Sequence, residues 1–190
     1  MRIKDEHKQE ALVQATVDLV NEIGFAASSV AKIAKRAKVS PATLYIYHAN
    51  KEALLVSTYL EIKKSFARAI TQGIDETTPV KEGLRHFWFN LFDYALDHGD
   101  YFQYAEQFAN SPYHDQVDMA ALESYFTPLL ELIHRGVREK QIKDVGLDIL
   151  HVFLFHPAKA LANSKVCQEF TPTRENIETA FELAWDAVRL

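Results

Sequence analysis

The sequence predicts an all-α protein of about nine helices, in which an N-terminal three-helix domain (residues 1–50) precedes a larger helical domain (residues 51–190). Three observations support this prediction. Apolar residues recur at helical spacing along nearly the whole chain, capping residues and glycines mark helix ends, and two short N-terminal helices are joined by only three or four residues. Short helices joined in this way are typical of a helix-turn-helix.

The composition is that of an ordinary globular protein. Hydrophobic residues make up 48% of the 190 residues and charged residues 25%. The single cysteine, Cys167, excludes an intramolecular disulfide and a multi-cysteine zinc site, and it suits a reducing compartment. No apolar run follows the basic N-terminal residues, and none reaches membrane-spanning length. We therefore expect a soluble cytoplasmic protein with no membrane partner.

The charge is divided unevenly along the chain. Residues 1–51 contain eight Lys or Arg and five Asp or Glu, a net charge of +3 within a chain whose total is −5. A basic N-terminal part on an acidic body is what a small nucleic-acid-binding domain would show.

The first two helices follow from apolar spacing and capping residues. The first buries a stripe that recurs at helical spacing, formed by Leu12, Ala15, Leu19 and Ile23. Gly24 then provides a stop signal, and either Ser28 or Ser29 can cap the second helix. The apolar positions of this second helix share one face: Val30, Ile33, Ala34 and Ala37.

The third and fourth helices begin at clear capping signals. Ser40 followed by Pro41 is an N-cap and first-turn pair, and Asn50 caps a longer helix that starts at Lys51 and runs to about Ile74. A small core is expected to fix the angle of the helix-turn-helix, formed by Ile33, Ala34, Val39 and Leu44.

The third helix is expected to have an exposed face suited to the DNA major groove and its flanking phosphates. This face consists of Pro41, Ala42, Thr43, Tyr45 and Tyr47. Spacing alone also allows a pair of helices with no DNA-binding role.

The run GFAASSVAKIAKRAKVSPATLYIYHANKEALL resembles the DNA-binding domain of the TetR family, and the resemblance covers residues 7–56. Its most specific part is the string V-S-x-x-T-L-Y-x-Y-x-x-x-K-E-x-L, which begins at Val39. The resemblance implies a homodimeric regulator, usually a repressor, with a helical ligand-binding and dimerisation domain. Its partners would be double-stranded operator DNA and an unknown small-molecule effector.

The resemblance also implies roles for single residues. Ser29 and Lys51 match phosphate contacts, and Tyr45 and Tyr47 match backbone contacts that sometimes reach bases. The positions that meet base edges are Pro41, Ala42 and Thr43. Two residues depart from the family pattern: Ala42 replaces a usual glycine, and His48 replaces an aromatic residue. We interpret His48 as a packed substitute rather than a pH sensor, and Arg2 and Lys4 as either a short DNA-binding arm or a solvated tail.

Aromatic residues are concentrated in the middle of the chain. Residues 87–126 hold twelve of the twenty-two, in segments separated near Asp100, which we expect to cap a short helix, and near Pro112. These rings either fill a helical core or line a cavity for an apolar or aromatic ligand. For the cavity, the candidate polar ligand-binding residues are His86, Asn90, Tyr104, Gln107 and Tyr125.

The last two helices are expected over residues 147–164 and 173–189, with Pro157 kinking or interrupting the first of them. Residues 147–163 are apolar on more than one face, whereas a terminal helix of a small domain needs only one buried stripe. The excess indicates a partner surface, which agrees with the family's dimerisation through its last two helices.

No catalytic motif is present, and we expect neither an enzyme nor a cofactor. Two acidic and histidine trios have the residue types of metal ligands but are expected to be solvated: Asp97, His98 and Asp100, and His114, Asp115 and Asp118. Three hypotheses remain: a ligand-released repressor, a regulator of the same fold controlled by a protein partner or by no ligand, and an enzyme with a helix-turn-helix attached.

Overall fold

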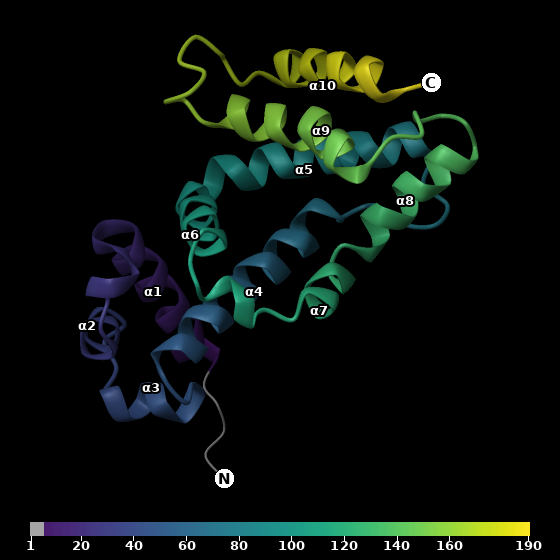
Figure 1. Cartoon of the computed structure of the whole chain (residues 1–190). Coiled ribbons are helices and arrows are strands. Elements are labelled where there is room, and N and C mark those ends of the chain that lie inside the picture. The colour runs from purple at the N-terminus through teal and green to yellow at the C-terminus, as the bar shows by residue number, and fades with distance from the viewer. Residues whose placement is uncertain (1–5) are drawn as a thin grey trace. The chain divides into compact units, whose positions relative to one another are not determined.

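The computed structural model describes residues 6–190, so Arg2 and Lys4 lie outside the described residues. This part of the chain contains ten α-helices and one short 3-10 helix (Figure 1), which confirms the all-α fold with one α-helix more than the nine or so expected. The helices are α1 (Glu6–Ala27), α2 (Val30–Arg36), α3 (Pro41–Tyr47), α4 (Lys51–Ile70), α5 (Val80–Asp97), α6 (Gly99–Ala109), η1 (His114–Gln116), α7 (Met119–Ser124), α8 (Thr127–Arg138), α9 (Leu147–Ala162) and α10 (Arg174–Val188). No helix among the described residues is long and apolar enough to cross a membrane.

The chain divides into two compact units. The first consists of the described part of Met1–Lys64 together with Asp100–Leu122, and the second of Ser65–Gly99 together with Glu123–Leu190. The first unit therefore contains α1, α2, α3, most of α4, most of α6 and η1. α6 belongs to this unit although it lies some fifty residues beyond α3 in the chain.

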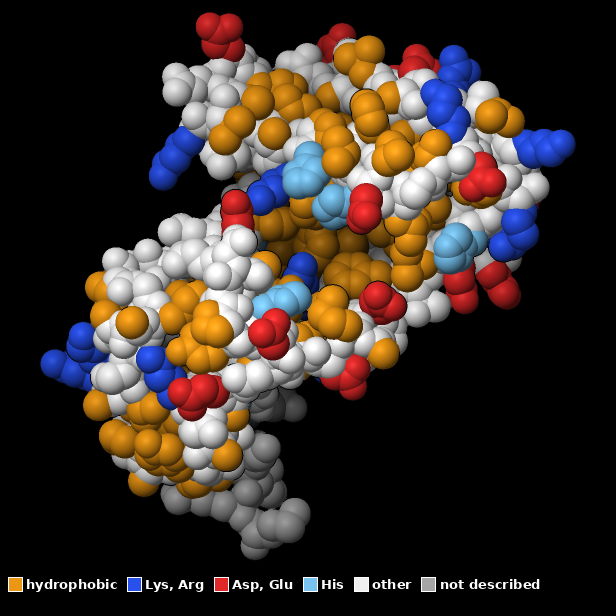
Figure 2. All heavy atoms as spheres, viewed as in Figure 1, with side chains coloured by type: hydrophobic (Ala, Val, Ile, Leu, Met, Phe, Trp, Pro, Cys, Tyr) orange, Lys and Arg blue, Asp and Glu red, His pale blue; other side chains and the backbone are white. Residues whose placement is uncertain are grey.

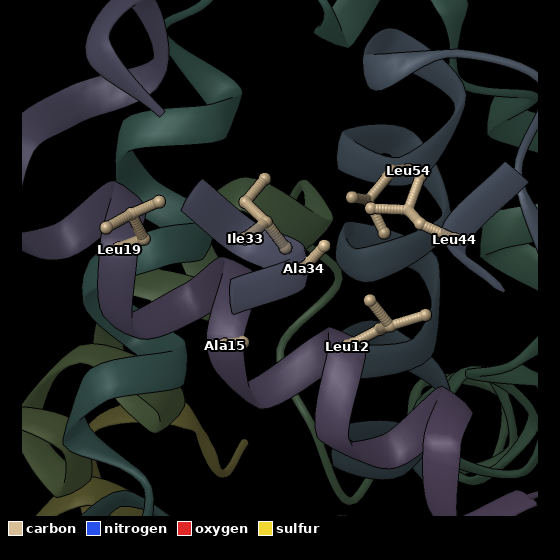
Figure 3. Close-up of a cluster of buried hydrophobic side chains, with 7 residues drawn as sticks. All are labelled: Leu12, Ala15, Leu19, Ile33, Ala34, Leu44 and Leu54. Carbon is tan, nitrogen blue, oxygen red and sulfur yellow. The ribbon is translucent and has the colours of Figure 1, made fainter. Parts of the chain in front are cut away.

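The core of the first unit holds the helix-turn-helix together. Figure 3 shows seven buried side chains from α1, α2, α3 and α4 that form it: Leu12, Ala15, Leu19, Ile33, Ala34, Leu44 and Leu54. Val39 packs against this cluster from the turn. The small core predicted for the helix-turn-helix is thus confirmed, and shortening one of its leucines to alanine is expected to cost roughly 2–5 kcal/mol.

One helix end in the first unit agrees with the sequence prediction, and another differs from it. The regular part of α1 ends at Gly24, as predicted, because Gly24 adopts φ 74° and ψ 170°, a non-helical conformation that side chains disfavour. A short helical stretch then continues from this kink to Ala27. α6 begins at Gly99, so Asp100 lies in its first turn and does not cap it. The Asp100 carboxylate instead accepts a hydrogen bond from Gln14 Nε2 at 2.9 Å.

In the second unit, α5 packs against α8, α9 and α10. The approach of α8 to α5 is close at Gly83, where an added Cβ would lie 2.6 Å from Leu132 Cδ2. On the α10 side, Trp88 is fully buried and meets the Phe181 ring edge-on at 6.1 Å. Arg85 of α5 forms a two-oxygen ion pair with Glu178 of α10, which joins the same two helices at their solvent edge.

The turn between α4 and α5 is built around one aspartate. α4 ends at Ile70, four residues before the predicted end. Asp75 Oδ1 accepts hydrogen bonds from the backbone amides of Thr77 and Thr78 at 2.8 and 3.0 Å, and from both hydroxyls at 2.7 and 3.0 Å. These bonds, led by that from the Thr77 hydroxyl, lower the pKa of Asp75 to about 2. Arg135 of α8 donates to the carbonyls of Glu76 and Thr78, which fixes the turn to α8.

The last two helices follow the sequence prediction within two residues. α9 runs through Pro157 to Ala162, so the predicted interruption of the helix at this proline is wrong. Thr173 caps α10 by accepting a hydrogen bond from Asn176 N at 3.2 Å.

Candidate nucleic-acid interface

Local capping positions α2 and α3. Ser29 accepts a hydrogen bond from Lys32 N at 3.3 Å, and Ser40 accepts one from Thr43 N at 3.1 Å. Ser28, the alternative cap for α2, instead donates to the carbonyl of Gly24 at 2.7 Å. Between the two helices the chain reverses at Lys38, whose φ of 55° is left-handed. The result is a compact helix-turn-helix whose second helix starts at Pro41.

α3 has one buried face and one exposed face. Leu44 is fully buried, whereas Tyr45 and Ile46 are 55% and 46% exposed. Pro41 and Ala42 are also exposed at the start of the helix, and Thr43 and Tyr47 are half-buried. Ile46 was not among the predicted contacts, because its exposure depends on how α3 is rotated against the core.

Positive charge near α3 is partly paired within the protein. Arg36 forms a two-oxygen ion pair with Glu22, at 2.5 and 2.7 Å, and this hydrogen bonding lowers the pKa of the Glu22 carboxyl. Lys35 and Lys38 are exposed on the C-terminal end of α2 and on the turn. Lys51 Nζ donates to the carbonyl of Phe25 at 2.6 Å, so this ammonium is held beside the end of α1.

All seven predicted DNA contacts lie on consecutive elements of the first unit. They are Ser29 at the start of α2, five residues of α3, and Lys51 at the start of α4, where Asn50 accepts a hydrogen bond from Ala53 N at 2.7 Å. Their contact with DNA remains a prediction. His48 is buried, and its ring centroid lies 6.5 Å from that of Tyr47, as expected for a packed substitute.

The predicted ligand-binding residues are divided between the two units. In the second, His86 Nδ1 lies 2.9 Å from the Gly73 carbonyl oxygen, and Asn90 Nδ2 donates to the Gln72 carbonyl at 2.9 Å. Both side chains therefore fasten α5 to the turn that precedes it. Tyr125, near the start of α8, is half-buried.

In the first unit, Tyr104 and Gln107 also make internal hydrogen bonds. The Tyr104 hydroxyl donates to the Leu55 carbonyl at 2.9 Å, and Gln107 Nε2 donates to Asn21 Oδ1 at 3.0 Å. Tyr104 is fully buried, and this burial raises the pKa of its hydroxyl. Four of the five predicted polar groups thus have partners inside the protein.

The second unit contains an aromatic cluster that the sequence did not single out. The Phe66 ring centroid lies 5.3 Å from that of Tyr94 and 6.1 Å from those of Phe126 and Phe155. His151 stacks on Phe155 at 4.3 Å. These residues come from four separate segments, so spacing along the chain carries no signal for the cluster.

The exposed face of α9 is largely apolar, and α10 adds one exposed leucine. Ile149, Val152 and Phe153 of α9 are 51%, 52% and 47% exposed, and Leu183 of α10 is 69% exposed. Figure 2 shows hydrophobic side chains gathered over α9 and α10, in the upper part of the view. In contrast, Leu150 and Leu154 are buried, so α9 is apolar on two faces, as the sequence indicated.

Within residues 6–190 no group of three or more His, Cys, Asp or Glu side chains is arranged to hold a metal ion. Both trios of acidic and histidine residues noted in the sequence lie within this range.

A capped helix-turn-helix with an exposed second helix, in a chain whose other elements are also helical, is the arrangement of a helix-turn-helix DNA-binding protein. Two family models match it: residues 12–58 match the bacterial regulatory proteins of the tetR family, and residues 79–189 match the tetracyclin repressor-like C-terminal domain. The chain belongs to the TetR family of transcription regulators.

Similar proteins agree with this assignment. A solved TetR family transcription regulator from Marinobacter aquaeolei VT8 is 38% identical, with a TM-score of 0.89 over 100% of this chain and 99% of that one. An uncharacterised HTH-type transcriptional regulator of Haemophilus influenzae is 23% identical over 95% of both chains. The fatty acid metabolism regulator protein of Bacillus subtilis is 29% identical, over 75% of this chain and 74% of its own.

Proposed function

We propose that the protein is a repressor that binds a near-palindromic operator as a homodimer and is released by a small apolar or aromatic ligand. Residues 1–50 would form the DNA-binding domain and residues 51–190 the ligand-binding and dimerisation domain. The observation that carries the DNA-binding part is the exposed face of α3, where Tyr45 and Ile46 leave large apolar surfaces in solvent. Isolated exposed residues are common, but two neighbours on a short capped helix form a surface suited to a groove.

In this proposal α3 enters the major groove from its N-terminal end. Pro41, Ala42 and Thr43 would meet base edges and thymine methyl groups, and Ile46 would extend the apolar contact. The phosphate contacts would come from Ser29, Tyr45, Tyr47 and Lys51. Since proline, alanine and isoleucine donate no side-chain hydrogen bonds, part of the sequence preference would depend on DNA shape.

The exposed apolar residues of α9 and α10 support a homodimer. Val152, Phe153 and Leu183 expose apolar surface that a second copy would cover, and two helices from each subunit would form a four-helix bundle. Dimerisation places two copies of α3 on one face of the DNA. Their half-sites would then lie about one helical turn apart, roughly 34–36 Å.

Two relatives support an apolar or aromatic effector. One is named a fatty acid metabolism regulator, and the other, from Paenarthrobacter nicotinovorans, a nicotine-responsive repressor. In this chain such a molecule would contact the cluster of Phe66, Tyr94, Phe126 and Phe155, in which the rings of Phe126 and Phe155 are half-buried. The five predicted polar residues remain candidates, but His86, Asn90, Tyr104 and Gln107 would have to exchange an internal hydrogen bond for one to the ligand.

The test is selection of bound duplexes from random DNA at physiological salt, using protein refolded from denaturant to remove any bound small molecule. The expected result is a palindrome with half-sites one turn apart. Tyr47→Ala should weaken binding to all duplexes, whereas Thr43→Ala should change which duplexes are preferred. Sequence-blind binding by the stripped protein would overturn the proposal.

The ligand is tested separately with the selected operator. Release by fatty acids or small aromatic amines, each titrated into the complex, would support the effector part of the proposal. Operator binding that no such compound alters would instead favour control by another route.

A further inference from the structure

The segment that joins α1 to α2 is bent in a defined way. Gly24 holds the left-handed conformation that kinks α1, and its carbonyl accepts a hydrogen bond from the Ser28 hydroxyl at 2.7 Å. The kink separates Phe25 from the straight part of α1. Phe25 is half-buried, and its ring and its carbonyl contact different parts of the first unit.

The Phe25 ring packs against aromatic residues of α6 and the segment after it. Its centroid lies 5.8 Å from that of Tyr104, 6.1 Å from Phe108 and 5.5 Å from Tyr113. Phe108 in turn stacks on Tyr59 of α4 at 4.4 Å. Interlocked rings of this kind allow few alternative positions, so the location of Phe25 depends on the location of α6.

Polar contacts hold α6 along the rest of α1. Gln14 Nε2 donates to the Asp100 carboxylate at 2.9 Å, and the Tyr101 hydroxyl donates to Gln14 Oε1 at 3.1 Å. Asn21 Nδ2 donates to the Asp100 carbonyl at 2.8 Å. α6 is therefore attached to α1 both upstream of the kink and, through Phe25, beyond it.

The Phe25 carbonyl reaches the start of α4. It accepts a hydrogen bond of 2.6 Å from Lys51 Nζ, in a half-buried position. An ammonium has three donors, and this bond uses one of them, which leaves two for a phosphate oxygen. Holding the long lysine side chain in one place also reduces the conformational entropy that a phosphate contact would otherwise cost.

We propose that Phe25 is a positioning residue for DNA binding, which couples α6 to the phosphate contact made by Lys51. The position of the Phe25 ring depends on the position of α6, and the Phe25 carbonyl holds the Lys51 ammonium by a hydrogen bond. A displacement of α6 would move Phe25 and release Lys51 without any change in α3. The inference rests on the proposed function, since it takes Lys51 to be a phosphate contact.

A double-mutant cycle tests the coupling, with Phe25→Leu, Lys51→Met and the combined variant. Operator affinity is measured by fluorescence anisotropy over a range of salt concentrations, because each phosphate contact contributes about 0.9 to the slope of log K against log salt. Lys51→Met should weaken binding about tenfold and reduce the slope by about 0.9. Phe25→Leu should do nearly the same, and the double variant should be no weaker than Lys51→Met.

Phe170→Leu is the matched control. Phe170 is also half-buried and contacts one ring, Phe92 at 6.2 Å, in the second unit. It should leave the salt slope unchanged. The inference would be overturned if Phe25→Leu left the salt slope unchanged, or if its loss of operator affinity added to that of Lys51→Met. Operator binding by the unaltered protein would in that case still support the proposed function. Absence of operator binding by the unaltered protein would overturn both.

A second measurement needs no DNA. The rate of reductive methylation at Lys51, read by mass spectrometry, reports whether its ammonium is held. It should rise severalfold in Phe25→Leu relative to the exposed Lys35 of the same molecule, and stay unchanged in Phe170→Leu. An unchanged rate in Phe25→Leu, in protein with an unaltered circular dichroism spectrum, would contradict the positioning role.

Discussion

Gly136 of α8 lies at a close approach between buried residues of the second unit. An added Cβ would lie 2.5 Å from Ile142 Cδ1, 2.8 Å from Val80 Cγ1 and 2.9 Å from Ile142 Cγ1. Val80 and Ile142 are each 1% exposed, so neither side chain can move into solvent. The backbone is held as well, because the amides of Gln141 and Ile142 both donate to the Gly136 carbonyl, at 2.8 and 3.1 Å.

These contacts decide whether a Gly136→Ala substitution raises or lowers the stability of the protein. Alanine is favoured over glycine in a helix by about 1 kcal/mol. Overpacking a closed core costs roughly 1–3 kcal/mol. The added methyl group would lie within 3.0 Å of two buried side chains, so we expect a cost near the upper end of that range. The expected net loss is about 2 kcal/mol, which lowers the thermal midpoint of a chain of this size by about 4–8 °C.

The assay is thermal and chemical unfolding followed by circular dichroism at 222 nm. Gly99→Ala is the matched control, since Gly99 lies in the first turn of α6 and an added Cβ there meets nothing within 4 Å. It should unfold at the same midpoint as the unaltered protein or slightly above it. If Gly136→Ala were as stable as Gly99→Ala, the packing argument for α8 would be refuted.

Three further predictions concern the dimer, the turn of the helix-turn-helix and the α4–α5 turn. Val152→Glu should convert the proposed dimer to monomers in sedimentation velocity, whereas Leu96→Glu, at a similarly exposed leucine of α5, should not. A dimer that survives Val152→Glu would show that the interface does not include this part of α9. Lys38→Gly should stabilise the protein by about 0.5 kcal/mol in urea unfolding, because relief of a left-handed backbone, roughly 1–2 kcal/mol, exceeds the entropy that glycine adds to the unfolded chain; a lower urea midpoint would contradict this. Hydrogen bonding in the folded state lowers the pKa of Asp75 to about 2. The carboxylate therefore contributes fully to the free energy of unfolding above the ordinary aspartate pKa near 4, and this contribution is lost as the pH falls toward 2. The stability difference between the protein and Asp75→Asn should therefore shrink over that range, and a constant difference would refute the assignment.

The sequence by itself determined the helix-turn-helix and most helix boundaries, because these depend on local interactions. Ser40 and Asn50 cap the helices that follow them through bonds spanning three residues. Ile33 and Leu44 are close in sequence, and their helical spacing was enough to predict a shared core. The apolar excess on α9 was likewise visible in the chain, since one helix cannot bury two faces in a small domain.

Only the tertiary structure decided how polar and aromatic residues are used. Tyr104 has the same sequence pattern whether it lines a pocket or fills a core, and its burial against Leu55 is a contact across forty-nine residues. The hydrogen bond from Lys51 to Phe25 joins residues twenty-six apart and lies next to the kink at Gly24, and neither feature leaves a periodic signal in the sequence. Contacts between segments distant in the chain depend on how whole helices pack, and that packing is a property of the folded molecule rather than of any local pattern.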